Sequence, residues 1–282
     1  MPGTLYIVAT PIGNLADITL RALSVLREVD LIAAEDTRVT HNLLRHYDID
    51  TTTTPFHRHS LARPAERLID ELRAGKNIAI VSDAGTPGIS DPGHEIITLA
   101  IDAGIPVVAI PGPNAVVTAL VASGLPTARF AFEGFPPRRP SDRRSAFRTL
   151  AGEPRTLVFY ESPHRLQASL ADMRAAWGDR RIAVVREATK IFEEVVRGTI
   201  GEAVEHFELN PPRGEFTIVV EGAEPVEEKP SGERVKETLA DLLDSGLSER
   251  DAVKAVIAEQ GLPKNEAYRF MLELKEERSG EA

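Results

Sequence analysis

Short apolar runs alternate with stretches of helical periodicity along the first 123 residues of the chain. The runs are rich in Val, Ile and Ala, which is typical of strands buried on both faces of a sheet. We expect strands at residues 5–9, 31–34, 77–81 and 106–110 and helices at 39–47, 65–74, 95–103 and 114–123. A further helix is expected after Asp17, because aspartate favours the position that begins a helix. This alternation predicts a mainly parallel sheet with helices on both faces.

The pattern becomes mixed after Gly124-Leu-Pro126, which we expect to act as a hinge. Strands are expected at residues 130–135, 156–160, 182–186, 193–198 and 216–221, and helices at 141–150, 164–177 and 201–207. Thr199 and Glu202 form a capping-box pattern before the last of these helices. The last two strands suggest antiparallel pairing. Residues 1–123 are therefore interpreted as one α/β domain and residues 124–222 as a second, mixed α/β domain.

The last part of the chain, residues 223–282, has a different composition. It contains 15 acidic and 9 basic side chains and begins with an acidic, Pro-containing linker at 224–231. Helices are expected at residues 233–244, 248–260 and 264–277. The sharp break between the last two is compatible with a helix-turn-helix. The net acidity favours instead a small helical appendage that packs on its own chain or on a partner.

The composition is that of a globular protein, and we expect it in the cytoplasm. The 282 residues are 42% hydrophobic and 27% charged, which allows a sizeable core. No stretch approaches the ~18 apolar residues of a membrane span, and the strand expected at residues 5–9 argues against a signal peptide. The absence of cysteine excludes disulfides and thiolate metal sites. The net charge of −10 argues against an avid binder of free nucleic acid, so such contacts must come from local patches.

Four loops that follow expected strands are rich in Gly, Pro, Asn and acidic residues. They are Thr10–Asn14, Glu35–Arg38, Asp83–Gly93 and Pro111–Asn114. In a parallel sheet all four meet at one edge, which is where open α/β sheets hold ligands. The stretch Ser82–Gly93 is the most informative, because three glycines, two prolines and two aspartates in a dozen residues cannot form regular structure. For this stretch alone, a tight turn without a ligand is the alternative.

The glycine pattern of these loops narrows the kind of ligand. The first loop has one glycine and lacks the G-x-G-x-x-G fingerprint of dinucleotide sites, and the chain also lacks a P-loop signature. A phosphate cradle is therefore disfavoured at the first loop. A ligand held by backbone groups and small side chains fits better, such as a nucleoside with a compact charged tail.

Charged clusters follow three of the expected strands. They are Glu35-Asp-Thr-Arg38, Tyr160-Glu-Ser-Pro-His-Arg165 and Arg186-Glu-Ala-Thr-Lys190. Each cluster is either a surface ion pair, worth ~0–1 kcal/mol, or part of a site. The two clusters of the second domain suggest a cleft between the domains if they face the loops of the first.

A basic segment stands out in this acidic chain. Pro137–Arg148 carries five arginines and one acid. Arginines hold phosphates through bidentate hydrogen bonds, so the segment is a candidate for RNA contact, with an exposed amphipathic helix as the alternative. A smaller basic patch is His57-Arg-His59 together with Arg63. Carboxylates at metal-ligand spacing are lacking beside these histidines, so we expect no metal.

Eight segments carry a further signal when they are taken together. They are Leu5–Thr19, Ala34–Arg38, Ser82–Gly93, Pro111–Ala115, Phe132–Arg138, Glu161–Arg165, Arg186–Lys190 and Gly214–Thr217. This combination resembles the bacterial ribosomal RNA small subunit methyltransferase I family, a branch of the tetrapyrrole methylase-like superfamily. The resemblance covers nearly all of residues 4–222, and residues 223–282 resemble the family's helical extension more loosely. The superfamily's usual glycine-rich first loop is replaced here by Thr10–Asn14, as expected in this branch.

The resemblance implies two α/β domains of the tetrapyrrole methylase type with S-adenosylmethionine in the cleft between them, and a small C-terminal helical extension. It implies methyl transfer to the ribose 2′-oxygen of a cytidine in small-subunit ribosomal RNA, and a homodimer. The partner is then this RNA or the assembled small ribosomal subunit.

From these implications we assign candidate roles to residues of this sequence. The residues expected against S-adenosylmethionine are Pro11, Ile12, Gly13, Asn14, Asp83, Ala84, Gly85, Thr86, Gly88, Ile89, Ser90, Pro113, Asn114 and Ala115. The catalytic candidates are Glu35, Asp36 and Glu187 as general bases, and Lys190, which like Arg38 could hold a neighbouring phosphate. The residues expected to contact RNA are Arg38, His57, Arg58, Arg138, Arg139, Arg143, Arg144, His164 and Arg165.

Two other functions fit parts of the pattern. A small-molecule methyltransferase of the same fold would not need the arginine-rich segment. A non-catalytic RNA- or ribosome-binding factor would transfer no methyl group and would bind little S-adenosylmethionine. The convergence of the four loops argues against the second of these alternatives.

Overall fold

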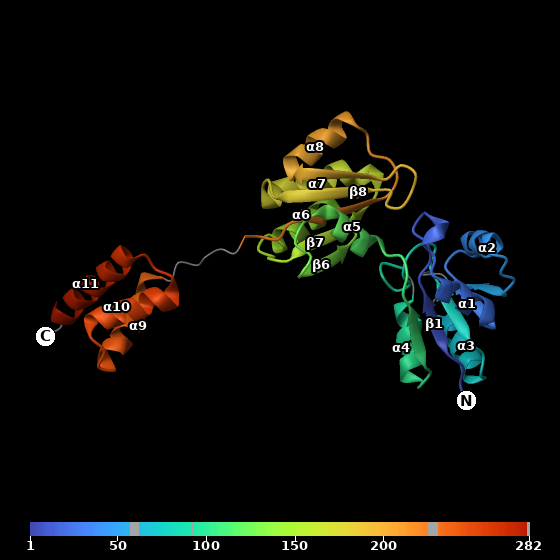
Figure 1. The fold of residues 1–282 in the computed structure, drawn as a ribbon, viewed down its shortest axis with the longest axis horizontal. Coiled ribbons are helices and arrows are strands. Elements are labelled where there is room, and N and C mark those ends of the chain that lie inside the picture. The colour runs from blue at the N-terminus through green and yellow to red at the C-terminus, as the bar shows by residue number, and fades with distance from the viewer. Residues whose placement is uncertain (57–61, 92, 225–230, 281–282) are drawn as a thin grey trace. The chain divides into compact units, whose positions relative to one another are not determined.

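The computed structural model describes residues 1–56, 62–91, 93–224 and 231–280. The predicted RNA contacts His57 and Arg58 therefore lie outside the described residues. The chain forms two compact units, residues 1–223 and residues 224–282, called the first and second units below. The first unit contains two sheets with helices on their faces, and the described part of the second is helical (Figure 1).

The first sheet is parallel throughout, which confirms the prediction. Its strands are β1 (Leu5–Val8), β2 (Leu31–Ala34), β3 (Thr53–Pro55), β4 (Ile78–Val81) and β5 (Val107–Ile110), in the order β3-β2-β4-β1-β5. Because all neighbouring strands run parallel, the loops after β1, β2, β4 and β5 leave from one edge. The edge strand β3 has no apolar run that would predict it, since it consists of two threonines and a proline.

Two helices pack on each face of the first sheet. On one face they are α1 (Leu20–Glu28) and α2 (Thr37–His46), and on the other α3 (Ala62–Arg73) and α4 (His94–Asp102). The prediction that Asp17 begins the first helix was wrong. Asp17 ends a short 3₁₀ turn, η1 (Leu15–Asp17), and the side chain of Thr19 caps α1 by accepting a hydrogen bond from the backbone N–H of Ala22. Asp17 and Thr19 are both favourable cap residues, and the extended backbone at Ile18 separates the turn from the helix.

The second sheet is mixed. Its strands are β6 (Phe130–Gly134), β7 (Thr156–Glu161), β8 (Arg181–Arg186), β9 (Glu194–Thr199) and β10 (Phe216–Val220), in the order β6-β7-β10-β8-β9. β6 and β7 are parallel and the other neighbours are antiparallel. The expected pairing of β9 with β10 was wrong, because β8 lies between them and pairs with both. A central β8 is consistent with its sequence, in which four consecutive residues are buried.

The helix α5 (Ala115–Ser123) packs on the second sheet. Its residues Val116, Ala119 and Leu120 share an apolar cluster with strands β7, β8 and β10, and the side chain of Arg197 on β9 donates hydrogen bonds to the backbone carbonyl of Ala122. The predicted division between residues 123 and 124 places this helix with the first sheet, which its packing does not support. The sequence of α5 is apolar on nearly all sides, so its pattern does not indicate which sheet it covers.

Three helices cover the opposite face of the second sheet. They are α6 (Pro140–Thr149), α7 (Pro163–Trp177) and α8 (Ile200–Leu209), and α8 begins with the predicted capping box of Thr199 and Glu202. Trp177 packs among the aromatic rings of Phe147 and Phe159, and its indole N–H donates a 2.6 Å hydrogen bond to the backbone carbonyl of Phe147. This aromatic core holds α6 and α7 together beneath the sheet.

The second unit forms a small core of its own. Its described helices are α9 (Gly232–Asp244), α10 (Glu249–Gln260) and α11 (Lys264–Gly280). Apolar residues of all three, among them Leu239, Val256 and Met271, are buried against one another. The ion pair between Arg278 and Asp244, at 3.0 Å, links the ends of α11 and α9.

We predict that Leu170→Ala destabilises the core of the second sheet by about 2–5 kcal/mol, because Leu170 is fully buried and the truncation leaves a cavity. Urea unfolding followed by tryptophan fluorescence measures this effect. Trp177 is the chain's single tryptophan and lies in the same cluster. The matched control is Leu209→Ala on α8, where the leucine is 82% exposed and its loss should leave the transition within about 0.5 kcal/mol. Equal shifts for the two variants would contradict the assignment of the core.

Candidate functional site

A cavity of about 440 Å³ is lined by residues from both sheets of the first unit. The four loops of the first sheet each contribute to it, through Ile12, Glu35, residues 83–86 with 89–91, and Asn114 with Ala115. The predicted convergence of these loops at one edge of the sheet is therefore confirmed. The cavity has the volume of an ordinary small-ligand site.

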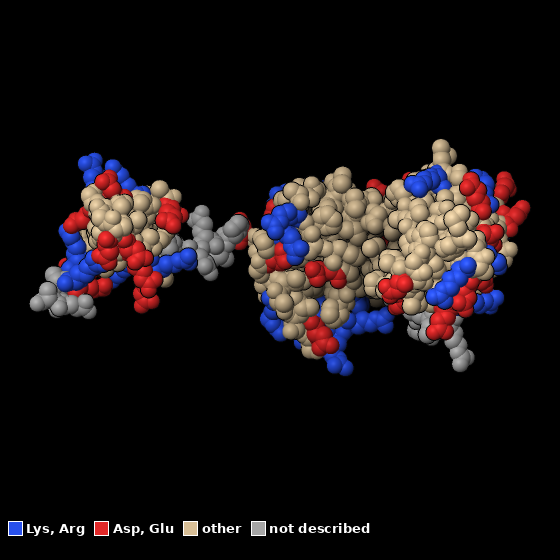
Figure 2. Space-filling view, turned by 90° about the horizontal axis from the view of Figure 1, so that it is seen from below, with Lys and Arg blue, Asp and Glu red and all other residues tan. Residues whose placement is uncertain are grey.

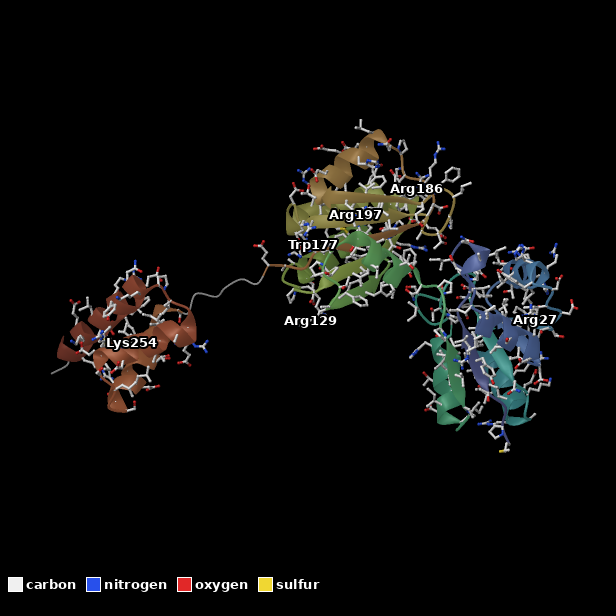
Figure 3. The ribbon with its side chains drawn as sticks, viewed as in Figure 1. Arg27, Arg129, Trp177, Arg186, Arg197 and Lys254 are labelled. Carbon is white, nitrogen blue, oxygen red and sulfur yellow. The ribbon has the colours of Figure 1, made fainter. Side chains whose placement is uncertain are left out.

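Strand register explains the contribution of the second sheet. Phe216, at the start of β10, lies opposite Glu161 at the end of β7 and opposite Arg186 at the end of β8. This row forms one edge of the sheet, and Tyr160, Val185 and Thr217 lie one residue further in. Of these residues all but Arg186 line the cavity. In Figure 3, Arg186 lies at this edge and Arg129 at the opposite end of the sheet.

Backbone contacts fix the first loop against the third. Thr10 and Gly85 exchange two backbone hydrogen bonds, and the hydroxyl of Thr10 donates a 3.0 Å hydrogen bond to the backbone carbonyl of Ser82. Asn114 caps α5, because its side-chain oxygen accepts hydrogen bonds from the N–H groups of Val116 and Val117. These bonds hold the loops after β1, β4 and β5 in place without using a ligand.

The two carboxylates after β2 have different environments. Asp36 caps α2 and forms a 2.6 Å ion pair with Arg38, whose hydrogen bonds hold the pKa of Asp36 at about 2. Asp36 is therefore ionised and already paired, which makes it a poor general base. Glu35 lines the cavity, and its carboxylate accepts a 3.4 Å hydrogen bond from the backbone N–H of Asp83.

A second charged cluster lies beside the first loop. Lys190 donates hydrogen bonds of 2.9 Å to the carboxylates of both Glu187 and Glu215. Burial alone would raise the pKa of Glu187, but hydrogen bonds from Lys190 and from the backbone of Glu215 outweigh it and lower this pKa. Burial would likewise lower the pKa of Lys190, and its bonds to the two glutamates raise it. Glu187 is thus held as an ion, which does not favour its predicted role as a base.

Two glycines allow this cluster to approach its neighbours. A Cβ atom at Gly13 would lie 2.4 Å from the Cγ atom of Lys190, so the lysine stem packs directly on the first loop. A Cβ atom at Gly214 would lie 2.5 Å from the carboxyl carbon of Glu187. Both glycines also have positive φ angles, which other residues rarely adopt. The close approach of Lys190 to Gly13 joins the second sheet to the loop after β1.

A buried ion pair occupies the predicted RNA-contacting cluster at the end of β7. The carboxylate of Glu161 is inaccessible to solvent and accepts hydrogen bonds from Arg165, from the hydroxyl of Ser169 and from the N–H of Ser162. Arg165 also donates a 2.8 Å hydrogen bond to the backbone carbonyl of Pro136. The guanidinium of Arg165 is therefore used within the fold, which does not favour its predicted contact with RNA. His164 is exposed beside it.

The arginines of α6 and of the loop before it differ in their exposure to solvent. Arg143 is only 5% exposed and forms a 2.7 Å ion pair with Asp172 of α7, which does not favour its predicted contact with RNA either. Arg143 faces inward toward α7 because it lies on the same side of α6 as the buried Phe147, four residues later. Arg138, Arg139 and Arg144 are exposed. Figure 2 shows basic and acidic side chains interspersed on the face in view, without one extended basic surface.

Other predicted residues fall inside and outside the cavity lining. Those in the lining are Ile12, Glu35, Asp83, Ala84, Gly85, Thr86, Ile89, Ser90, Asn114, Ala115 and Lys190, and those outside it are Pro11, Gly13, Asn14, Asp36, Gly88, Pro113 and Glu187. The sequence analysis gave no role to Phe135, Tyr160, Glu215, Phe216 and Thr217, which also line the cavity. Their positions at strand ends are the sequence signal that could have identified them.

Among these additional residues, Tyr160 has a phenol whose pKa is shifted by its surroundings. Burial, with a smaller contribution from the negative charge of Asp91, raises the pKa of its phenol to about 12. The phenol therefore stays protonated at neutral pH.

No three His, Asp or Glu side chains among the described residues come together in a way that would hold a metal ion. None of the helices in the described part of the chain has the length and apolar character needed to cross a membrane.

Comparison with solved structures identifies the fold. Cobalt precorrin-4 methyltransferase, a cobalamin biosynthetic enzyme, superposes with a TM-score of 0.59 at 20% identity, covering 77% of this chain and 94% of that chain. Uroporphyrin-III C-methyltransferase from Thermus thermophilus, in complex with S-adenosylhomocysteine, gives a TM-score of 0.54 at 22% identity, covering 77% and 97%. At these identities the likeness shows the fold alone.

Sequence comparison is more specific. A family model for tetrapyrrole (corrin/porphyrin) methylases matches residues 4–204. Ribosomal RNA small subunit methyltransferase I of Halalkalibacterium halodurans is 47% identical over 94% of this chain and 93% of its own length. The protein of the same name from Escherichia coli O157:H7 is 47% identical over 96% of this chain and 95% of its own length. The chain therefore belongs to the tetrapyrrole methylase family and, within it, to the ribosomal RNA small subunit methyltransferase I proteins.

Proposed function

We propose that this chain uses S-adenosylmethionine to methylate the ribose 2′-oxygen of a cytidine in small-subunit ribosomal RNA. The observation that carries the proposal is the 47% identity, over nearly the whole chain, to proteins named for methylation of this RNA. The cavity supports it, because the loops expected to hold the methyl donor converge there. The choice of the ribose oxygen and of cytidine rests on the family resemblance.

The charge and shape of the cavity fit the proposed donor. Among the described residues that line the cavity, five are carboxylates and one is a lysine, and such a surplus of negative charge favours a cationic ligand. Apolar side chains, among them Ile12, Ile89 and Phe135, supply walls for a flat nucleoside. When bound, this donor supplies a methyl group on a positively charged sulfur, which becomes a neutral thioether as the acceptor oxygen takes the methyl.

The lining residues have distinct proposed tasks. Glu35 takes the proton that the ribose hydroxyl loses, because among the three base candidates Glu35 lines the cavity, whereas Asp36 and Glu187 lie outside its lining. Lys190 holds the wall of the cavity beside the first loop, since its ammonium is engaged by two glutamates. Positioning of the two reactants supplies most of the acceleration in this scheme, about 7–11 kcal/mol when the geometry is good.

The RNA contacts and the assembly follow from exposed groups. Arg138, Arg139, Arg144 and His164 are exposed and would contact the RNA backbone. We further propose a homodimer, which would cover apolar side chains such as Val117 and Val121, exposed by 52% and 70% on α5. The ribosomal substrate would place the protein in the cytoplasm.

The primary test is transfer of labelled methyl groups to small ribosomal subunits prepared from cells that lack this activity, with labelled nucleotides located by mass spectrometry. We expect label on a cytidine ribose.

Ala115→Phe should weaken binding of S-adenosylmethionine at least about tenfold and reduce transfer, because the new ring enters the cavity. Isothermal titration calorimetry measures the binding.

Ala171→Phe is the control for this substitution, since Ala171 is exposed on α7 and lies outside the cavity lining. It should leave binding and transfer unchanged.

In the transfer experiment, label on a small ring-shaped acceptor and none on RNA would replace the proposal with a small-molecule methyltransferase. No donor binding by the wild-type chain would favour a non-catalytic factor.

Glu35→Gln should lower kcat by a factor of about 10²–10⁴, because the amide cannot accept the hydroxyl proton. Affinity for S-adenosylmethionine should change little. Single-turnover transfer to small subunits measures the rate. Asp36→Asn is the matched control, because asparagine is an equally good helix cap and Asp36 is already paired with Arg38. A rate for Glu35→Gln equal to that of Asp36→Asn would remove Glu35 as the base.

Replacing Arg138 and Arg139 together by Ala should weaken binding to small subunits and reduce the dependence of log K on log salt by about 1.4–1.8, as expected for the loss of two phosphate contacts. Filter binding between about 50 and 200 mM salt measures this slope. Affinity for the methyl donor should be unaffected. An unchanged slope would show that these two arginines do not contact the RNA.

A further inference from the structure

Phe135 combines exposure with a position in the wall of the cavity. It lines the cavity, and yet 55% of the residue remains accessible to solvent. One side of its ring is supported by Tyr160, whose ring centroid lies 5.5 Å away, and Tyr160 in turn packs against Phe132 at 4.9 Å. The ring therefore has an aromatic cluster behind it and an open surface in front. Exposing a large apolar ring is unfavourable in water unless a ligand covers it.

The backbone that carries Phe135 is fixed from two sides. Arg165 donates a hydrogen bond to the carbonyl of the next residue, Pro136, and is itself held by the buried carboxylate of Glu161. Gly134 packs near the loop after β4, since a Cβ atom there would lie 3.7 Å from the hydroxyl oxygen of Ser90. The ring is thus held in place before any ligand arrives, which reduces the entropy lost on binding.

Two arginines that follow Phe135 in the chain supply positive charge, which complements the negative charge of a nucleic-acid backbone. Arg138 and Arg139 are exposed three and four residues after Phe135. Proteins that bind unpaired nucleic acid combine aromatic rings, on which bases stack, with cationic side chains that contact the backbone. The same combination is present here, with Phe135 in the wall of the cavity where the methyl donor is proposed to bind and with Arg138 and Arg139 exposed shortly after it in the chain.

We propose that Phe135 stacks on an unpaired base of the acceptor RNA and so holds the target nucleotide at the cavity. This inference rests on the proposed function, because it requires an RNA acceptor. Stacking is tolerant of base identity, so Phe135 sets the position of the nucleotide and leaves the choice of base to other groups.

The test compares Phe135→Ala, Phe135→Leu and Phe135→Tyr in two assays, with small ribosomal subunits as the probe. Phe135→Ala should raise the KM for subunits and weaken their binding by roughly 5- to 150-fold, the range expected for one lost stacking contact. The Kd for S-adenosylmethionine should stay within about twofold. Phe135→Tyr should restore the wild-type values because it keeps the ring. Phe135→Leu should remain impaired, although it is apolar and of similar size.

The matched control is Phe130→Ala, because Phe130 is a partly exposed phenylalanine at the start of β6, the strand that ends one residue before Phe135. It should bind and methylate subunits like the wild-type chain. Wild-type behaviour of Phe135→Leu, or a loss confined to donor binding, would overturn the stacking proposal. A change in the oligomeric state of Phe135→Ala, measured by sedimentation, would also overturn the proposal. Such a change would assign the ring to an interface between copies of the chain.

Direct binding separates this inference from the proposed function. If the wild-type chain transfers no methyl group to subunits, the proposed function fails, and filter binding of the same variants still decides whether Phe135 contacts RNA. If the wild-type chain neither methylates nor binds small subunits, both proposals are overturned.

Discussion

The parallel pairing of β1 with β4 and β5 is the constraint on which the site depends. Parallel strands must all end at the same edge, so the loops after them are brought together whatever their separation in the sequence. The exchange of backbone hydrogen bonds between Thr10 and Gly85 then fixes two of these loops against each other. The second sheet supplies the opposite wall of the cavity through the register of β7, β8 and β10.

Charged residues near this cavity serve mainly to hold the structure together. Glu161 with Arg165 ties α7 to the loop after β6, and Arg143 with Asp172 ties α6 to α7. Removing one partner of a buried pair costs about 3–5 kcal/mol, because the remaining charge is left without compensation, so such arginines are poorly suited to reversible contact with RNA. Of the predicted RNA-contacting arginines that the structure describes before and within α6, Arg138, Arg139 and Arg144 are exposed and are the ones proposed to meet phosphates. The pair of Glu161 and Arg165 also gives the ring of Phe135 a rigid support, because Arg165 is bonded to the backbone of the next residue, Pro136.

Much of the fold could be predicted from the pattern of apolar residues. Buried strands such as β4 and β10 appear as continuous apolar runs, and glycines mark the ends of several helices. Three features could not be predicted this way. β3 lacks an apolar run, α5 is apolar on almost every side, and the placement of β8 between β9 and β10 depends on contacts between strands distant in the sequence. Each of these three features depends on which strand edge or sheet face of the folded chain is available for pairing or packing.

The sequence by itself determined the candidate site at the level of loops. Strand ends rich in Gly, Pro and acidic residues identified where a ligand would bind, because the direction of parallel strands follows from their helical connections. Only the tertiary structure decided the state of each side chain. Glu35 and Asp36 are adjacent in the chain, but the arginine two residues later pairs with Asp36 and lowers its pKa to about 2. Arg143 and Arg144 are likewise adjacent, but the turn of the helix buries the first against Asp172 and leaves the second exposed, since neighbouring residues on a helix point in directions about 100° apart.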